Sequence, residues 1–209
     1  MIGGFGTAGQ PAELIDGLIE LGVKGLTIIN NNGGNGDYGL AKLLKAGAVR
    51  KIICSFPRQS DSWVFDELYR AGKIELELVP QGTLVERIRS GGMGLGGVLT
   101  PTGLGTEVEE GKQIVEVDGA RFLLEKPLRA DFALIAAWQA DYVGNLSYLL
   151  TAHNFNPVMA LAGDTVIAEP NAIVPVGVIP PDAVKTPGVL VDHLLIRAGS
   201  GGQIWTAKN

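Results

Sequence analysis

The sequence predicts an α/β fold: a mostly parallel, open sheet with flanking helices, plus a β-hairpin. Short apolar segments alternate with segments of helical periodicity through the first half of the chain. Strands that alternate with short helices favour parallel pairing. Asp118-Gly119, between two segments of alternating polarity, is a strong hairpin signal. An antiparallel element is therefore expected within or beside the parallel sheet.

In the first half, the helices follow from apolar spacing and the strands from short apolar runs. The first helix begins at Pro11, a residue suited to a first helical turn, and places Leu14 and Leu18 on one face. Residues 74–79 alternate with period two, as expected of a strand with one face exposed to water. The expected helices are 11–21, 39–46, 63–71 and 84–88, and the expected strands are 26–29, 49–55 and 74–79.

In the second half, glycine, turn signals and apolar runs decide the prediction. Residues 90–105 hold too many glycines for a helix interior. The hairpin is expected over 115–122, and further core strands over 132–136, 165–168 and 189–196. With no repeat or linker in the sequence, residues 1–197 are expected to form one domain, followed by a flexible tail at 198–209.

Composition excludes several classes of protein. The 209 residues include 30 glycines, two histidines and one cysteine, and the net charge is −5. A lone Cys54 excludes a disulfide framework and a cysteine-cluster metal site, and two histidines make a histidine metal centre improbable. The charge balance gives no basic surface for nucleic acid, and no apolar run is long enough to span a membrane. We expect a globular cytoplasmic protein that holds no metal.

The glycine-rich opening is the first candidate site. Gly3, Gly4, Phe5 and Gly6 lead toward a helix, whose free N–H groups would attract an anion. A plain strand-to-helix turn explains the loop equally well. As a dinucleotide fingerprint it fails, because no strand precedes it and no acidic residue follows at the required distance.

Two further candidates follow apolar strands, where ligands of open α/β sheets gather. Asn30, Asn31 and Asn32 exceed what a turn requires, which favours a site over ordinary turn chemistry. Gln81 stands between a strand and a helix, and its amide N–H could stabilise a developing oxyanion. From spacing alone, a capping or surface glutamine is the favoured explanation of Gln81.

Other polar residues are better explained by structure than by catalysis. Asp131 and Asp141 flank an apolar strand, and His153 has no evident carboxylate partner. Cys54 ends an apolar strand and is assigned to the core. No nucleophile motif, phosphate loop or metal-binding motif occurs.

Motifs along most of the chain carry a family resemblance. They are Gly3-Gly4-Phe5-Gly6-Thr7-Ala8-Gly9-Gln10-Pro11, Asn31-Asn32, Pro80-Gln81-Gly82-Thr83-Leu84-Val85-Glu86-Arg87-Ile88-Arg89, Thr100-Pro101-Thr102-Gly103, Gly105-Thr106, Gly144-Asn145-Leu146 and Asn154-Phe155-Asn156. In this order they closely resemble the A (alpha) subunit of the family I coenzyme A transferases. Residues 54–62 and 65–77 look like the 3-oxoadipate CoA-transferase branch, which serves aromatic degradation through the β-ketoadipate pathway with succinyl-CoA as donor.

The resemblance implies a CoA-transferase (sugar-phosphate isomerase-like) fold and half of an active site. In this family a glutamate of the B (beta) subunit reacts with the acyl-CoA thioester and becomes a glutamyl-CoA thioester, in ping-pong fashion. By position, Gln81 would donate to the oxyanion, Asn31 and Asn32 would line the acyl pocket, and the loop of Gly3, Gly4, Phe5 and Gly6 would border it. The implied partner is the beta subunit, in an A2B2 heterotetramer, with a CoA thioester as substrate and no permanently bound cofactor.

Two departures from the family pattern stand out. The family usually has a helix and a strand before the Gly-Gly-Phe motif, whereas this sequence begins at Met1-Ile2; either the start lies too late, or the strand is lost and a sheet edge is exposed. His153 stands where the family commonly has Arg, which affects either an acidic substrate or an interface. The alternative functions are transfer to acetate, acetoacetate or another short 3-oxoacid and, in another class, a non-catalytic sensor domain.

Overall fold

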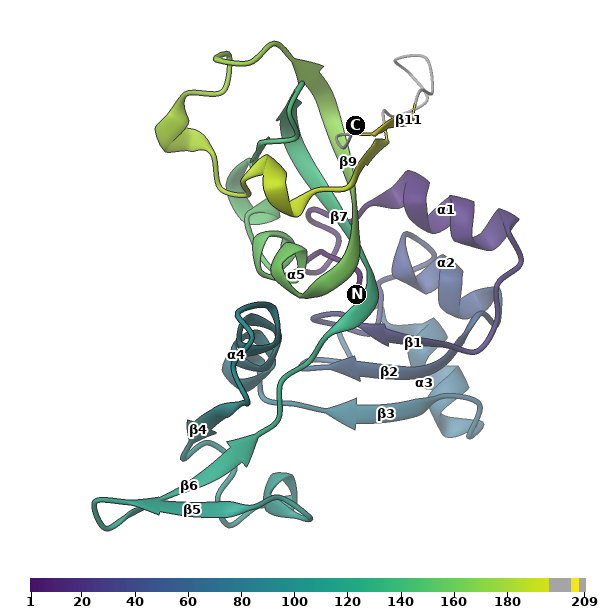
Figure 1. The fold of residues 1–209 in the computed structure, drawn as a ribbon. Helices are drawn as coiled ribbons and strands as arrows, with labels where there is room; N and C mark the ends of the chain where they lie inside the picture. The colour runs from purple at the N-terminus through teal and green to yellow at the C-terminus, as the bar shows by residue number, and fades with distance from the viewer. Residues whose placement is uncertain (196–203, 207–209) are drawn as a thin grey trace.

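The computed structural model describes residues 1–195 and 204–206 (Figure 1). Its α-helices follow the predicted order, and α5 adds one that the apolar spacing did not indicate. The 3-10 turns η1 (Glu107–Glu109), η2 (Leu150–Ala152), η3 (Pro181–Ala183) and η4 (Gly188–Leu190) lie in the second half of the chain. The helices are α1 (Ala12–Glu20), α2 (Leu40–Lys45), α3 (Trp63–Arg70), α4 (Gln81–Gly92) and α5 (Asn156–Ala162).

The strands form three hydrogen-bonded groups. A parallel group has the order β1-β2-β3, a mixed group β11-β10-β9-β7-β8, and an antiparallel group β4-β6-β5. The strands are β1 (Leu26–Ile29), β2 (Val49–Cys54), β3 (Glu75–Leu78), β4 (Val98–Thr100), β5 (Ile114–Val117), β6 (Ala120–Glu125), β7 (Ala130–Asp141), β8 (Leu146–Ser147), β9 (Gly163–Val174), β10 (His193–Leu195) and β11 (Ile204–Thr206).

Residues 1–3 connect the first two groups. Ile2 N–H donates to the Ile29 carbonyl on one side, while Gly3 N–H donates to the Leu134 carbonyl on the other. Leu134 N–H donates back to the Met1 carbonyl, and Ile2 bridges Leu134 in parallel. The first residues therefore lie between β1 and β7. The expected mostly parallel open sheet is confirmed, with antiparallel β11 and β8 at opposite edges of the mixed group.

The third group, which we call the arm, is the expected hairpin with one more strand. Val117 pairs with Ala120 across the Asp118-Gly119 turn, and β4 pairs with the other edge of β6. Asp118 (φ 49°) and Gly119 (φ 78°) both adopt the left-handed conformation that this turn requires. Figure 1 shows the arm extending away from the body below α4.

Some element boundaries differ from the prediction. Helix α4 continues to Gly92, so the expectation that residues 90–92 are non-helical was wrong. The last predicted strand is shorter, because Gly188–Leu190 form the 3-10 turn η4 and β10 begins at His193. Most of the expected tail at 198–209 lies outside the described residues, although Ile204–Thr206 pair with β10 as β11.

Two apolar clusters lie on either side of the sheet. One joins α4 and α5 to β7 and β9 through buried Leu84, Ile88 and Met159. The other joins α1, α2 and α3 to β1 and β2 through buried Ile15, Leu43 and other residues. The sheet separates the two clusters, and neighbouring residues of one segment face opposite sides: Met1 belongs to the first cluster and Ile2 to the second.

Candidate active site

A glycine-rich turn forms one border of the site. Phe5 and Ala8 exchange backbone hydrogen bonds of 2.9 and 3.1 Å, which close a tight loop over residues 5–8. Gly4 (φ 125°) and Gly6 (φ 59°) take conformations that other residues rarely adopt. A Cβ at Gly3 would lie 1.7 Å from Asn156 Oδ1, so a side chain there is excluded as well. These glycines are thus required by backbone shape and close packing.

Buried amides fix the loop from two sides. Gln10 Nε2 donates to the Gly6 carbonyl (2.6 Å), and Leu40 N–H donates to Gln10 Oε1 (2.9 Å). Asn156 Nδ2 donates to the Gly9 carbonyl (3.0 Å). The sequence carries no independent signal for either amide, because their partners lie on distant segments.

The asparagine run attaches to the same loop. Asn30 Nδ2 donates to the Ile2 carbonyl (2.6 Å), and its Oδ1 accepts from Asn32 N–H (2.9 Å). Asn32 Nδ2 donates to the Gly6 carbonyl (3.5 Å). Asn30 and Asn32 therefore hold the backbone of the glycine loop, while Asn31 projects to a different partner.

That partner is Gln81. Gln81 Nε2 donates to Asn31 Oδ1 at 2.8 Å, and the same oxygen accepts from Ser55 Oγ at 2.8 Å. Asn31 is 1% exposed, whereas Gln81 is exposed at the first turn of α4. An amide nitrogen carries two N–H groups, so one can hold Asn31 while the other faces a substrate oxygen. The free backbone N–H groups of the helix start add positive potential there.

Gln81 lies in a cleft of about 1020 Å³ between α4, the arm and residues 151–158. Phe5 of the glycine loop also lines it, whereas Gly3, Gly4, Gly6, Asn31 and Asn32 do not appear in its wall. Asn31 and Asn32 are buried, 1% and 0% exposed, and of the two Asn31 contacts Gln81. Gln81 thus lines the cleft directly, whereas Asn31 is connected to the cleft through its hydrogen bond with Gln81.

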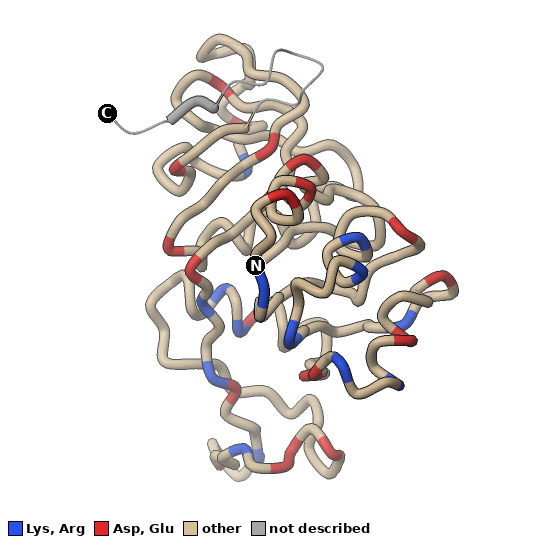
Figure 2. The backbone as a smooth tube through the Cα atoms, turned by 90° about the vertical axis from the view of Figure 1, so that its right-hand side faces the viewer, with Lys and Arg blue, Asp and Glu red and all other residues tan. Residues whose placement is uncertain are grey.

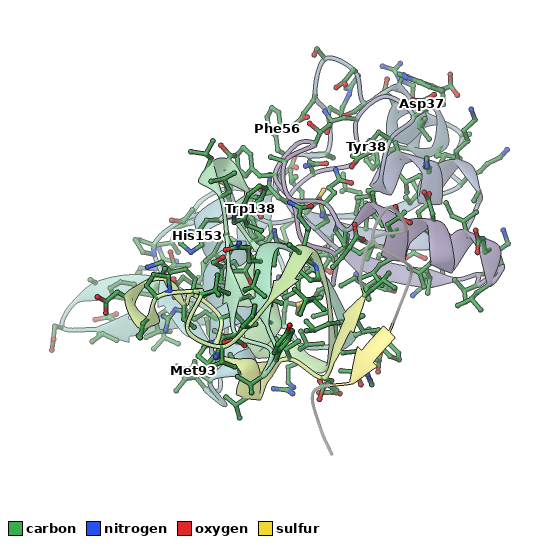
Figure 3. All side chains as sticks on the ribbon, turned by 90° about the horizontal axis from the view of Figure 1, so that it is seen from above. Asp37, Tyr38, Phe56, Met93, Trp138 and His153 are labelled. Atoms are coloured by element: carbon green, nitrogen blue, oxygen red, sulfur yellow. The ribbon has the colours of Figure 1, made fainter. Side chains whose placement is uncertain are left out.

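Two basic side chains lie in the wall of this cleft. Arg89 Nε donates to Glu86 Oε2 at 2.9 Å, and the hydrogen bond and charge of Glu86 raise the pKa of Arg89. His153 is exposed and its ring lies 5.6 Å from that of Tyr148, centroid to centroid. Figure 3 labels His153 and Trp138 in the view from above. The His153 imidazole therefore lies in the wall of the cleft.

The remaining candidates have structural positions. Buried Asp141 accepts from Val143 N–H, Asn145 N–H and Asn145 Nδ2, so it fixes the turn after β7. Asp131 is exposed. Cys54 is fully buried, and burial raises the pKa of its thiol to about 12.

Residues 1–195 and 204–206 offer neither a metal site nor a membrane-spanning helix. No group of three or more His, Cys, Asp or Glu side chains among them could hold a metal ion. No helix of this described part is long and apolar enough to cross a membrane. Figure 2 shows acidic and basic residues interspersed along the backbone.

Known proteins share this fold and much of this sequence. The family described as coenzyme A transferase matches residues 1–196, so the chain belongs to the coenzyme A transferases. It is 63% identical to the A (alpha) subunit of the 3-oxoadipate CoA-transferase of Acinetobacter baylyi, covering 93% of this chain and 86% of that protein. It is 48% identical to the alpha subunit of the acetate CoA-transferase of Escherichia coli, covering 96% of this chain and 90% of that protein.

A solved structure supports the fold. The apoenzyme of an acyl-CoA transferase from Escherichia coli O157:H7 superposes with a TM-score of 0.79 at 24% identity. The match covers 99% of this chain and 44% of that one, so the chain spans less than half of that structure. At this identity the likeness concerns the fold alone.

Proposed function

We propose that the protein is the alpha subunit of an enzyme that moves coenzyme A from succinyl-CoA to 3-oxoadipate. The observation that carries the proposal is the Gln81 amide, held by Asn31 at the start of α4 and facing the cleft. The 63% identity to the A (alpha) subunit of the 3-oxoadipate CoA-transferase of Acinetobacter baylyi supports the choice of substrate.

In the proposed reaction, the beta subunit supplies a glutamate carboxylate as nucleophile. The carboxylate adds to the thioester carbonyl of succinyl-CoA, and the resulting oxyanion accepts a hydrogen bond from Gln81 Nε2. The C–S bond breaks, leaving a mixed anhydride and CoA thiolate. The thiolate then attacks the glutamyl carbonyl, releasing succinate and forming glutamyl-CoA. 3-Oxoadipate reverses these steps and leaves as 3-oxoadipyl-CoA.

Substitution of Gln81 tests the proposed oxyanion role. In the enzyme reconstituted with the beta subunit, Gln81→Ala should lower kcat by roughly 10²–10³, the usual effect of losing one oxyanion donor. Gln113→Ala is the control, because that side chain is exposed just before β5 on the arm. A loss of less than threefold in Gln81→Ala would refute the oxyanion role.

Dependence on the beta subunit is a second part of the proposal. The isolated chain should show no transfer, and adding its partner should restore it, with an A2B2 assembly detected by light scattering. Transfer by the isolated chain would contradict the half-site proposal. The proposal further places the enzyme in the cytoplasm, where a lone thiol such as Cys54 stays reduced, and makes the CoA thioester its substrate.

The second candidate is the same chemistry on a shorter acid. It is favoured by the 48% identity to the alpha subunit of the acetate CoA-transferase of Escherichia coli. The two candidates are separated by comparing kcat/KM for 3-oxoadipate with kcat/KM for acetate and acetoacetate. A higher value for either monocarboxylate would replace the first proposal.

A further inference from the structure

A buried carboxylate lies where the arm meets the body. Glu125, the last residue of β6, is 1% exposed. Lys112 Nζ donates to Glu125 Oε1, and Arg87 Nε lies 3.8 Å from Glu125 Oε2. A buried carboxylate is strongly destabilising unless it is paired. Glu125 therefore requires a cation from the arm, Lys112, and is approached by one from α4, Arg87.

Arg87 continues this arrangement toward the parallel sheet. Its side chain is 11% exposed; Nε donates to the Lys126 carbonyl (2.8 Å) and Nη1 to Glu77 Oε1 (3.1 Å). Lys51 Nζ donates to the other oxygen of Glu77 (2.6 Å). Burial opposes ionisation of Glu77, but its hydrogen bonds to Lys51 and Arg87 outweigh burial and lower its pKa.

We call this series of five alternating charges the charge chain. It begins on β2 and β3, passes through α4, and ends at the last residue of β6 and its partner just before β5. The charge chain therefore connects the body to the arm. It consists of Lys51, Glu77, Arg87, Glu125 and Lys112.

The charge chain lies next to both walls of the cleft. Helix α4, which contains Arg87, begins with Gln81 on one wall. Glu125 pairs with Val98 in β4, and β4 continues into Thr100 on the opposite wall. Figure 1 shows the arm projecting from the body, with α4 between them. The angle of the arm relative to α4 therefore sets the distance between these walls.

We propose that Arg87 and Glu125 are positioning residues for coenzyme A transfer: they hold the arm at the angle where Gln81 and the β4 wall contact one CoA thioester. This proposal rests on the proposed function. Neither residue lines the cleft, so both act through the elements that they join. A loosened arm should weaken thioester binding more than it slows the chemical step, because Gln81 and Asn31 keep their own contact.

The test uses the enzyme reconstituted with the beta subunit. The double variant Lys112→Met/Glu125→Gln removes the arm's ion pair without leaving a buried unpaired charge. KM for succinyl-CoA should rise about tenfold, equivalent to about 1.4 kcal/mol of lost binding, while kcat changes less than threefold. The matched control is Glu75→Gln, which breaks the exposed Arg50–Glu75 pair and should leave both constants unchanged.

A second variant keeps the test decisive if the double variant fails to fold. Arg87→Lys retains the positive charge but loses the planar guanidinium that reaches Lys126 and Glu77 together, so KM should rise by an intermediate factor. A purely structural role would lower the unfolding temperature and leave KM unchanged. KM within twofold of the unsubstituted enzyme in the folded variants would overturn the proposal.

Hydrogen exchange separates this proposal from the proposed function. Amides of residues 98–125 should lose protection in the double variant and retain it in Glu75→Gln, with no substrate present. If the unsubstituted enzyme transfers CoA to none of the acids, the proposed function fails, and exchange still reports whether the charge chain anchors the arm. Unchanged protection of the arm in the double variant would overturn the anchoring on which positioning depends.

Discussion

Asn31 is the residue on which the orientation of Gln81 depends. Its Oδ1 accepts from Gln81 Nε2 and from Ser55 Oγ, so a buried amide held by the segment after β2 determines where an exposed amide on α4 lies. A glutamine without this partner would sample several rotamers and lose entropy on binding each oxyanion.

We expect Asn31→Ala to lower kcat about tenfold, in keeping with the loss of one hydrogen bond of roughly 1.4 kcal/mol. Because Asn31 acts through Gln81, the double variant Asn31→Ala/Gln81→Ala should be no slower than Gln81→Ala alone, within threefold. Steady-state kcat of the four enzymes completes the cycle. Additive losses would mean that Asn31 contacts the substrate independently.

The thiol of Cys54 should be inert in the folded protein. Because burial raises its pKa to about 12, the thiolate fraction at pH 8 is on the order of 10⁻⁴, and the side chain is fully buried. Iodoacetamide should therefore label Cys54 in urea and leave the native chain unmodified, as judged by mass spectrometry. Native labelling at a rate like that of free cysteine would contradict the buried position.

At the scale of elements, the sequence predicted most helices and strands because apolar periodicity reports burial directly. What it could not predict was contact between distant elements. Gln81 and Asn31 were both chosen as candidates, but a separation of 50 residues hides the hydrogen bond that joins them. Asn156 showed no signal of its own, because its role depends on Gly9, 147 residues away.

The end of α4 shows why glycine content misled the prediction. Gly91 and Gly92 lie inside the helix, because a Cβ at Gly91 would come within 2.2 Å of the Leu128 carbonyl oxygen and one at Gly92 within 2.4 Å of Leu161 Cβ. Glycine here permits close packing of α4 on α5 and on residues 128–129. Its low helix propensity is outweighed by tertiary packing.

Two glycine-to-alanine substitutions test this explanation. We expect Gly92→Ala to destabilise the protein by about 1–3 kcal/mol through overpacking. Gly17→Ala, in the middle of α1 with open space around it, should stabilise by about 0.4–1 kcal/mol. Urea unfolding of both variants gives the comparison. Equal and small effects would show that α4 and α5 do not pack as closely as described.

At the scale of the whole molecule, two core clusters pack on opposite faces of the sheet, and ion pairs connect the outer elements. The stability of the folded protein therefore depends on pH, both in the acid and in the alkaline range. The lowered pKa of Glu77 means that the unfolded chain binds more protons below pH 4.5, so stability falls with falling pH. The raised pKa of Cys54 means that the folded chain keeps a proton that the unfolded chain loses above pH 9.0, so stability falls again with rising pH.

We therefore expect Glu77 to lower stability below about pH 5 and Cys54 to lower it above about pH 9. Glu77→Gln should reduce the loss of stability at acid pH, and Cys54→Ala should reduce the loss of stability between pH 9.0 and about 12. Urea midpoints measured at intervals of one pH unit provide the profile. A Cys54→Ala profile parallel to that of the unsubstituted chain would contradict the assignment of the alkaline side.

The place of residues 1–3 between β1 and β7 has a consequence for synthesis. Gly3 N–H has no partner until the carbonyl of Leu134 is made, 131 residues later in the chain. At elongation rates of about 5–20 residues per second, that interval lasts roughly 7–26 seconds. Over this time, neither β7 nor Asn156, which both contact the glycine loop in the folded protein, has been synthesised. Until β7 is synthesised, the side of residues 1–3 that faces β7 is an unpaired edge, and a chaperone that shields such edges should raise the yield of folded chain.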